Sequence, residues 1–148
     1  MAAGKRRRAR VVALQALYEA DSSNHEATET LERMVTSQSI AEEPAAFARE
    51  LVASVHAKRE EIDRTIAELA PAWPVAQLPP VDRNVLRLAI SEMLGDNRTP
   101  VSAVINEAVE LAKQFGSDKS ASFVNGVLGS IARQQKEPRT DQSTAGRG

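Results

Sequence analysis

The chain has 148 residues, no cysteine, 3% aromatic residues and a formal net charge of −1 at pH 7. The lack of cysteine excludes disulfides and thiolate chemistry and is typical of the reducing cytoplasm, where we expect this protein. No apolar run approaches the roughly 18 residues that a membrane-spanning helix needs. Abundant alanine and leucine predict an all-α fold with an aliphatic core.

The first predicted helix, at about 5–20, begins with a basic cluster. Its apolar face includes Leu14 and Leu17, which helical periodicity brings to one side. Five of the chain's 19 basic residues precede this face and leave 14 to balance 20 acidic residues. They are Lys5, Arg6, Arg7, Arg8 and Arg10. Because an unpaired guanidinium is costly to bury, we expect an exposed basic end on an anchored helix. A basic end on an acidic body suits a polyanionic partner.

Apolar residues at helical spacing predict more helices, about seven in all. These cover 31–35, 44–55, about 59–70, 82–94, 104–115 and 123–131, with a turn at 95–100. From Gln134 onward the sequence has no Leu, Ile, Val, Phe or Met. We therefore expect one helical domain at 1–133 and a disordered tail at 134–148.

A proline-rich connector at 71–81 divides this domain, because a helix cannot pass through four closely spaced prolines. It separates an N-terminal half at about 5–70 from a C-terminal half at about 82–133. We expect the apolar Trp73, Val75 and Leu78 of the connector to pack onto both halves. Asp82 is then expected to cap the next helix, whose broad apolar surface predicts a central, mostly buried position.

The positions of two glycines predict features of the helices in which they occur. Gly116 follows the helix at 104–115 and is expected at the C′ position that ends it. The dipeptide Asn125-Gly126 interrupts the periodic pattern of the last helix. Such an interruption predicts either close helix contact or a functional site.

The sequence has no enzyme signature. It contains neither a phosphate-binding loop nor a cysteine nucleophile, and His25 and His56 lie in separate segments. We expect a protein without catalytic activity, metal or cofactor.

The basic cluster has two interpretations that its charge does not separate. It is either a solubilising arm or a binding site for nucleic acid. Arginine suits bidentate phosphate contact and stacking on bases, and Gln15 and Tyr18 follow two to three turns later. Tyr18 fits either a core position or a platform for a base.

Four motifs follow one another across about residues 5–132. They are Arg6-Arg7-Arg8-Ala9-Arg10 with Ala13-Leu14-Gln15-Ala16-Leu17-Tyr18, the segment 82–89, the segment 105–113 with Phe115-Gly116, and the segment 123–128. In this order they resemble the NusB family of transcription antitermination and termination factors. The resemblance implies two packed helical sub-bundles and a factor without catalytic activity. It also implies pairing with NusE, a small-subunit ribosomal protein, and binding of the boxA element in ribosomal RNA leader transcripts. The pair helps RNA polymerase to read through terminators.

The same resemblance implies roles for individual residues. Arg6, Arg7, Arg8 and Arg10 are expected to hold RNA phosphates, with Gln15 and Tyr18 nearby. Phe123 and Asn125 are expected close to the same surface, and Lys119, where a relative has an acid, is expected to raise RNA affinity. Tyr18, Asp82 and Arg83 are expected to contact NusE, and for Asp82 a capping role is equally compatible.

Two alternatives remain. A similar helical domain is joined to ribosomal RNA cytosine methyltransferases, where it helps to dock an enzyme. This chain ends soon after its last predicted helix, which favours a free-standing factor. The other alternative is a purely protein-binding module. Self-association as a homodimer stays open.

Overall fold

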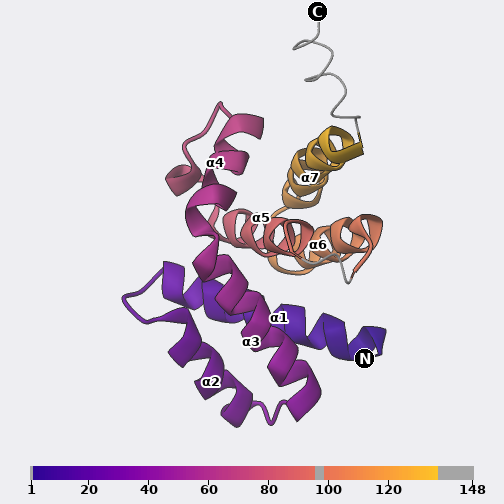
Figure 1. Cartoon of the computed structure of the whole chain (residues 1–148). Coiled ribbons are helices and arrows are strands. Elements are labelled where there is room, and N and C mark those ends of the chain that lie inside the picture. Colours follow the sequence, from indigo (N-terminus) through magenta and orange to yellow (C-terminus); the bar gives the residue numbers. More distant parts are fainter. Residues whose placement is uncertain (1, 96–98, 137–148) are drawn as a thin grey trace, which may run out of the picture.

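The computed structural model of the chain describes residues 2–95 and 99–136, and these residues form an all-α fold (Figure 1). The helices are α1 (Ala3–Asp21), α2 (Ala27–Ser37), α3 (Glu42–Ala57), α4 (Arg59–Leu69), α5 (Pro80–Met93), α6 (Val101–Phe115) and α7 (Ser120–Lys136), with a 3-10 turn η1 (Val75–Gln77). The predicted fold class is confirmed, and so is the predicted number of helices within the described residues.

Helix α5 connects two groups of helices. Helices α1, α2 and α3 pack against one another, and α6 packs against α7, while α5 contacts α1, α3, α4, α6 and α7 (Figure 1). The alanines Ala9, Ala13 and Ala16 of α1 are fully buried. Their small side chains permit the close helix packing that a core with few aromatic residues requires.

The central, buried position predicted for α5 is confirmed, since Val85, Leu86 and Ile90 are fully buried. The same helix also buries polar groups that apolar periodicity does not reveal. Arg87 donates to both carboxylate oxygens of Asp63 on α4, at 2.9 and 3.0 Å.

Arg83 and Asn84 of α5 both donate to Oδ2 of Asp21 at the end of α1, at 2.8 and 3.0 Å. Breaking a buried ion pair leaves an uncompensated charge, so these contacts hold α1 and α5 in one relative position.

The start of α5 differs from the prediction. The helix begins at Pro80, Pro79 occupies the N-cap position, and no side chain caps the end. Proline suits the first helical position because the missing N–H has no partner there. Asp82 therefore lies inside the first turn, and its predicted role as N-cap is wrong.

The connector packs through its backbone more than through its tryptophan. Leu78 is buried as predicted, but Trp73 is 56% exposed, so its predicted packing is wrong. Nη1 of Arg83 donates to the carbonyl oxygens of Val75, Ala76 and Leu78 at 3.3, 3.1 and 2.9 Å. One buried arginine thus holds the connector against α5.

The structure corrects the Gly116 prediction and excludes one of the two alternatives for Gly126. Gly116 ends α6 with a φ of −98°, so it does not adopt the left-handed conformation of a C′ glycine. A Cβ atom at Gly126 would meet nothing within 4 Å, so Gly126 makes no close helix contact.

The last helix continues to Lys136, three residues beyond the predicted boundary at 133. The rest of the predicted tail, 137–148, and the middle of the predicted turn, 96–98, lie outside the described residues. Within the described part of the chain, no helix has the length and apolar character needed to cross a membrane.

Candidate nucleic-acid interface

We call Lys5, Arg6, Arg7, Arg8 and Arg10 at the start of α1 the basic turn. The side chains of Lys5 and Arg7 are 55% and 60% exposed, and Arg8 is also exposed. Arg6 is partly buried. Arg10 is only 4% exposed, so the prediction of an exposed side chain is wrong at this position.

Arg10 is buried because it has partners on two other helices. Its Nε and Nη2 atoms donate to the two carboxylate oxygens of Glu92 on α5, both at 2.8 Å. The guanidinium also lies 5.4 Å from the ring centroid of Phe47 on α3, within the range of a cation–π contact. Arg10 therefore anchors the basic turn to the core and leaves the neighbouring arginines at the surface.

The exposed cations have partners as well. Arg7 forms a bidentate pair with Glu107 on α6, with N···O distances of 3.0 and 2.9 Å. This hydrogen bonding to Arg7 holds the pKa of the Glu107 carboxyl below its usual range, so Glu107 is ionised at neutral pH. Lys5 lies 3.4 Å from Glu43 on α3. The basic turn is thus balanced by acidic residues from other helices.

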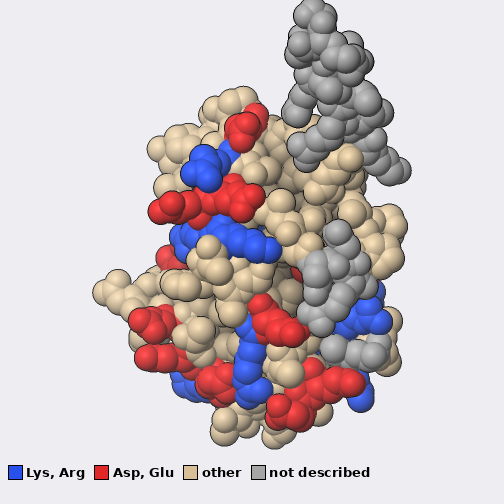
Figure 2. All heavy atoms as spheres, in the orientation of Figure 1, with Lys and Arg blue, Asp and Glu red and all other residues tan. Residues whose placement is uncertain are grey.

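The molecular surface shows the same charge balance more widely. On the face drawn in Figure 2, Lys and Arg side chains lie beside Asp and Glu side chains and form no single positive field. Any polyanion that binds the basic turn therefore meets carboxylates next to the cations. The positions of individual cations must then decide where a polyanion binds, more than the overall charge of the face.

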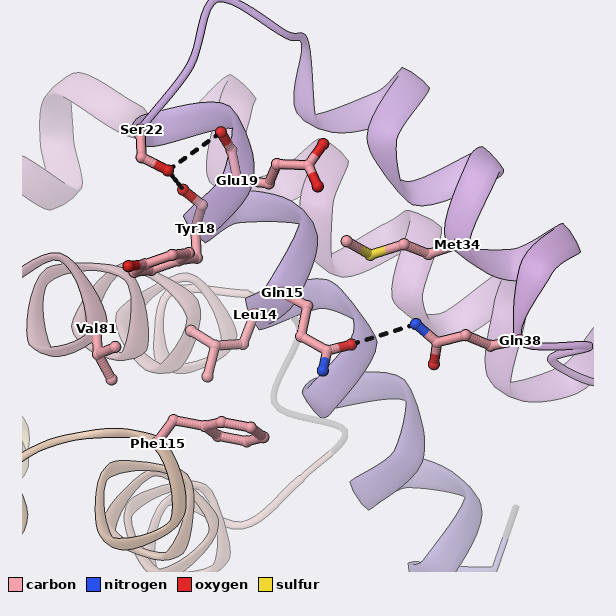
Figure 3. Close-up of a pocket in the computed structure, with 9 residues that line it drawn as sticks. All are labelled: Leu14, Gln15, Tyr18, Glu19, Ser22, Met34, Gln38, Val81 and Phe115. Atoms are coloured by element: carbon pink, nitrogen blue, oxygen red, sulfur yellow. Dashed lines mark hydrogen bonds between the residues drawn. The ribbon is translucent and has the colours of Figure 1, made fainter.

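A pocket adjoins the basic turn and contains Tyr18, which is 42% exposed. Its volume is about 500 Å³, and its apolar lining comes from α1, α2, α5 and α6 (Figure 3). The residues of this lining are Leu14, Met34, Val81 and Phe115. The exposed ring favours the interpretation of Tyr18 as a contact residue over that of a core residue.

Two amide side chains join the pocket to the basic turn. Gln38, just after α2, donates from Nε2 to Oε1 of Gln15 at 3.5 Å (Figure 3). Oε1 of Gln38 in turn accepts a hydrogen bond from Nη2 of Arg8 at 3.2 Å. The structure thus brings Arg8, Gln15 and Tyr18 together on one side of α1.

The loop between α6 and α7 is fixed by a buried contact. The hydroxyl of Ser120 donates to Oδ1 of Asp82 at 2.6 Å and accepts from the backbone N–H of Ser117 at 2.9 Å. A Cβ atom at Gly116 would lie 2.4 Å from this hydroxyl oxygen, so the contact requires glycine there. The exposed Lys119 is carried by this fixed loop.

Two further predicted RNA contacts lie on α7. Asn125 is exposed, whereas Phe123 is partly buried and packs against the core. Figure 1 shows α6 between α7 and the N-terminal end of α1. Helix α6 therefore connects these two residues to the basic turn, which contacts α6 through Arg7 and Glu107.

Asp82 and Arg83, predicted to contact a partner, are 5% and 8% exposed. The carboxylate of Asp82 accepts a hydrogen bond from Ser120, and Arg83 donates hydrogen bonds to Asp21 and to the backbone of the connector. We assign both residues a structural role.

Periodicity and charge did not identify the residues that form hydrogen bonds with the basic turn. The main ones are Glu92, Glu107 and Gln38. Glu107 belongs to the polar face of an amphipathic helix, and this was the only available signal. His25 and His56 lie in separate segments of the sequence and are both exposed, but they line one cavity of about 400 Å³. In the described residues, no group of three or more His, Asp or Glu side chains has a geometry suited to a metal ion.

Comparison with known proteins gives a consistent result. A family model described as the NusB family matches residues 7–133. A transcription antitermination protein NusB of Chloroflexus aggregans is 51% identical over 131 residues, or 87% of each chain. Another from a Roseiflexus species is 45% identical over 139 residues, or 93% of this chain and 98% of the relative. These relatives are transcription factors, which confirms the expectation of a non-enzymatic protein.

Solved structures agree with the fold. T. maritima NusB superposes with a TM-score of 0.81 at 32% identity, over 86% of this chain and 90% of that chain. A second similar chain comes from a crystal structure of the antitermination factors NusB and NusE in complex with double-stranded RNA. It has a TM-score of 0.82 at 28% identity and covers 90% of this chain and 99% of that chain.

Proposed function

Because the chain belongs to the NusB family, we propose that it is an RNA-binding transcription antitermination factor. In this proposal it pairs with NusE in the cytoplasm and binds boxA-type RNA in ribosomal RNA leader transcripts. The pair then supports processive transcription of ribosomal RNA operons by RNA polymerase. The similarity to a NusB chain crystallised with NusE and RNA supports this combination of partners.

The observation that carries the proposal is the arrangement of the basic turn. Arg10 anchors it through the buried pair with Glu92, and the side chains of Arg7 and Arg8 remain exposed. The parallel N–H donors of an arginine guanidinium match two oxygens of a phosphate. Because Arg10 fixes the basic turn in place, the protein loses little conformational entropy when this turn binds RNA. We assign the main phosphate contacts to Arg7 and Arg8, with Arg6 beside them and Arg10 as a positioning residue.

Sequence choice needs contacts beyond phosphate, because phosphate contacts carry no base information. The pocket with Tyr18 offers an exposed aromatic ring and the amide of Gln15, next to Arg8. Aromatic rings and amides are the groups that proteins use to stack on and read unpaired bases. We assign the junction between RNA and NusE to this pocket.

The second part of the proposed surface comprises Lys119, Phe123 and Asn125. Lys119 is exposed on a loop that Ser120 and Asp82 hold in place, and Asn125 is exposed on the helix that follows. Their separation from the basic turn by α6 fits an extended single strand better than a compact ligand.

The experiment is a titration of fluorescently labelled boxA RNA with the protein, alone and with NusE. A scrambled RNA of the same length serves as the control. We expect binding of boxA RNA that NusE strengthens, with weaker binding of the scrambled RNA. An RNA-independent complex with NusE and no RNA signal in either mixture would refute the proposal and indicate a protein-binding module.

A further inference from the structure

Arg7 is engaged by a carboxylate in the free protein. Its Nε and Nη2 atoms donate to the two oxygens of Glu107 at 3.0 and 2.9 Å. A phosphate with two oxygens toward a guanidinium accepts the same two parallel hydrogen bonds. The carboxylate therefore occupies the position and the donors that an RNA phosphate would need.

The pair is accessible to a competing anion. The Arg7 side chain is 60% exposed, whereas that of Glu107 is only 24% exposed and comes from the body of α6. A cleft of about 290 Å³ adjoins the pair and is lined by Arg7, Glu107, Glu110 and Lys113. Arg7 is thus the more exposed partner of the pair, and an anion can approach it from solvent.

We propose that Glu107 holds the phosphate-binding fork of Arg7 in the free protein, and that RNA binds this arginine by displacing the carboxylate. This inference rests on the proposed RNA-binding function. It makes Glu107 a residue that sets RNA affinity without contacting RNA. A surface pair of this kind is weak enough for phosphate to replace it.

The exchange has a characteristic salt dependence. When Arg7 moves from Glu107 to a phosphate, counterions leave the RNA, but the released carboxylate attracts cations. Arg7 then adds little to the slope of log K against log salt concentration. Without the carboxylate, the same contact adds the full contribution of about 0.7 for a single strand.

The test compares Glu107→Gln with Glu110→Gln in titrations of single-stranded boxA RNA, with NusE present, over a series of salt concentrations. Glu110 is the matched control because it lies one turn away on α6 and pairs with Lys113 at 3.5 Å. We expect Glu107→Gln to raise affinity about two- to fivefold at low salt and to steepen the slope by about 0.7. Glu110→Gln should change affinity less than twofold. In an Arg7→Ala background, Glu107→Gln should lose its effect.

Three results would overturn the inference. Lower affinity of Glu107→Gln would show that the carboxylate orients Arg7 for RNA. Equal gains from Glu107→Gln and Glu110→Gln, or a gain that persists without Arg7, would indicate a general charge effect. In these cases wild-type binding still supports the proposed function. Absence of RNA binding by the wild-type protein would overturn both.

Discussion

Asp82 and Ser120 are separated by 38 residues, yet the Ser120 hydroxyl donates a 2.6 Å hydrogen bond to the Asp82 carboxylate in a buried position. This contact joins the first turn of α5 to the first residue of α7. It therefore couples the central helix to the loop that carries Lys119.

Removal of this contact should destabilise the protein. Ser120→Ala leaves the Asp82 carboxylate buried without its donor, so we expect a loss of about 1–3 kcal/mol in the free energy of unfolding, measured by urea denaturation. Asp118→Asn alters an exposed side chain of the same loop and should stay within about 0.5 kcal/mol. Equal stability of the two variants would contradict the assigned role.

Two glycine substitutions should have opposite signs. In Gly116→Ala the new Cβ would lie 2.4 Å from the Ser120 hydroxyl oxygen and 2.8 Å from the Ala112 carbonyl oxygen. We expect a loss of about 1–3 kcal/mol from this overpacking. In Gly126→Ala the Cβ meets nothing within 4 Å, and alanine favours the helix by about 0.5–1 kcal/mol. Thermal denaturation of both variants distinguishes the signs, and destabilisation by Gly126→Ala would be inconsistent with an open helix face.

Substitution of Arg10 tests the anchor of the basic turn. Arg10→Ala leaves Glu92, whose side chain is only 8% exposed, without its partner. We expect a loss of about 3–5 kcal/mol in unfolding free energy, typical of a broken buried pair. Arg8→Ala, on the same helix but exposed, should change stability by less than about 0.5 kcal/mol. A small effect of Arg10→Ala would mean that the pair does not hold α1 to α5.

Asp21 should make stability dependent on acid pH. Burial alone would raise the pKa of its carboxyl, but hydrogen bonds from Arg83 and Asn84 and the charges of Arg83 and Arg87 outweigh burial and lower the pKa. Because the native pKa is lower than the unfolded one, ionised Asp21 contributes stability above about pH 4. This contribution is lost as the pH falls through the lowered native pKa.

The measurement is the unfolding free energy of the wild type and of Asp21→Asn as a function of pH. We expect Asp21→Asn to cost about 3 kcal/mol at neutral pH and the difference to shrink below about pH 4. Glu26→Gln, an exposed neighbour, is the control. A difference that stays constant down to pH 2 would rule out the proposed role of the Asp21 charge.

Periodicity predicted the helices because each apolar face is a local pattern, as in the burial of Leu14 and Leu17 on α1. It did not predict pairing between distant polar residues. Arg10 and Glu92 are 82 residues apart, and charge alone does not show which arginine of a cluster turns inward. The expectation of an exposed basic end was wrong at Arg10 for this reason.

Predictions from residue type were also wrong at two positions in or near the connector. Trp73 is apolar in type, but the Arg83 contacts to backbone carbonyls already hold the connector, and Trp73 stays more than half exposed. Asp82 is a favourable capping residue, but two prolines before it begin the helix earlier. The roles assigned to Lys119, Phe123 and Asn125 remain predictions.

The most direct test of RNA binding by the basic turn is the salt dependence of boxA RNA affinity for Arg8→Ala, measured with NusE. Arg8 is exposed and hydrogen-bonded to the neutral amide of Gln38, so no carboxylate needs to be displaced. Arg64→Ala on α4 removes the same charge at an exposed position far from the basic turn. We predict that Arg8→Ala flattens the slope of log K against log salt concentration by about 0.7 and that Arg64→Ala leaves it unchanged. Identical slopes for Arg8→Ala and the wild type would contradict phosphate binding by the basic turn.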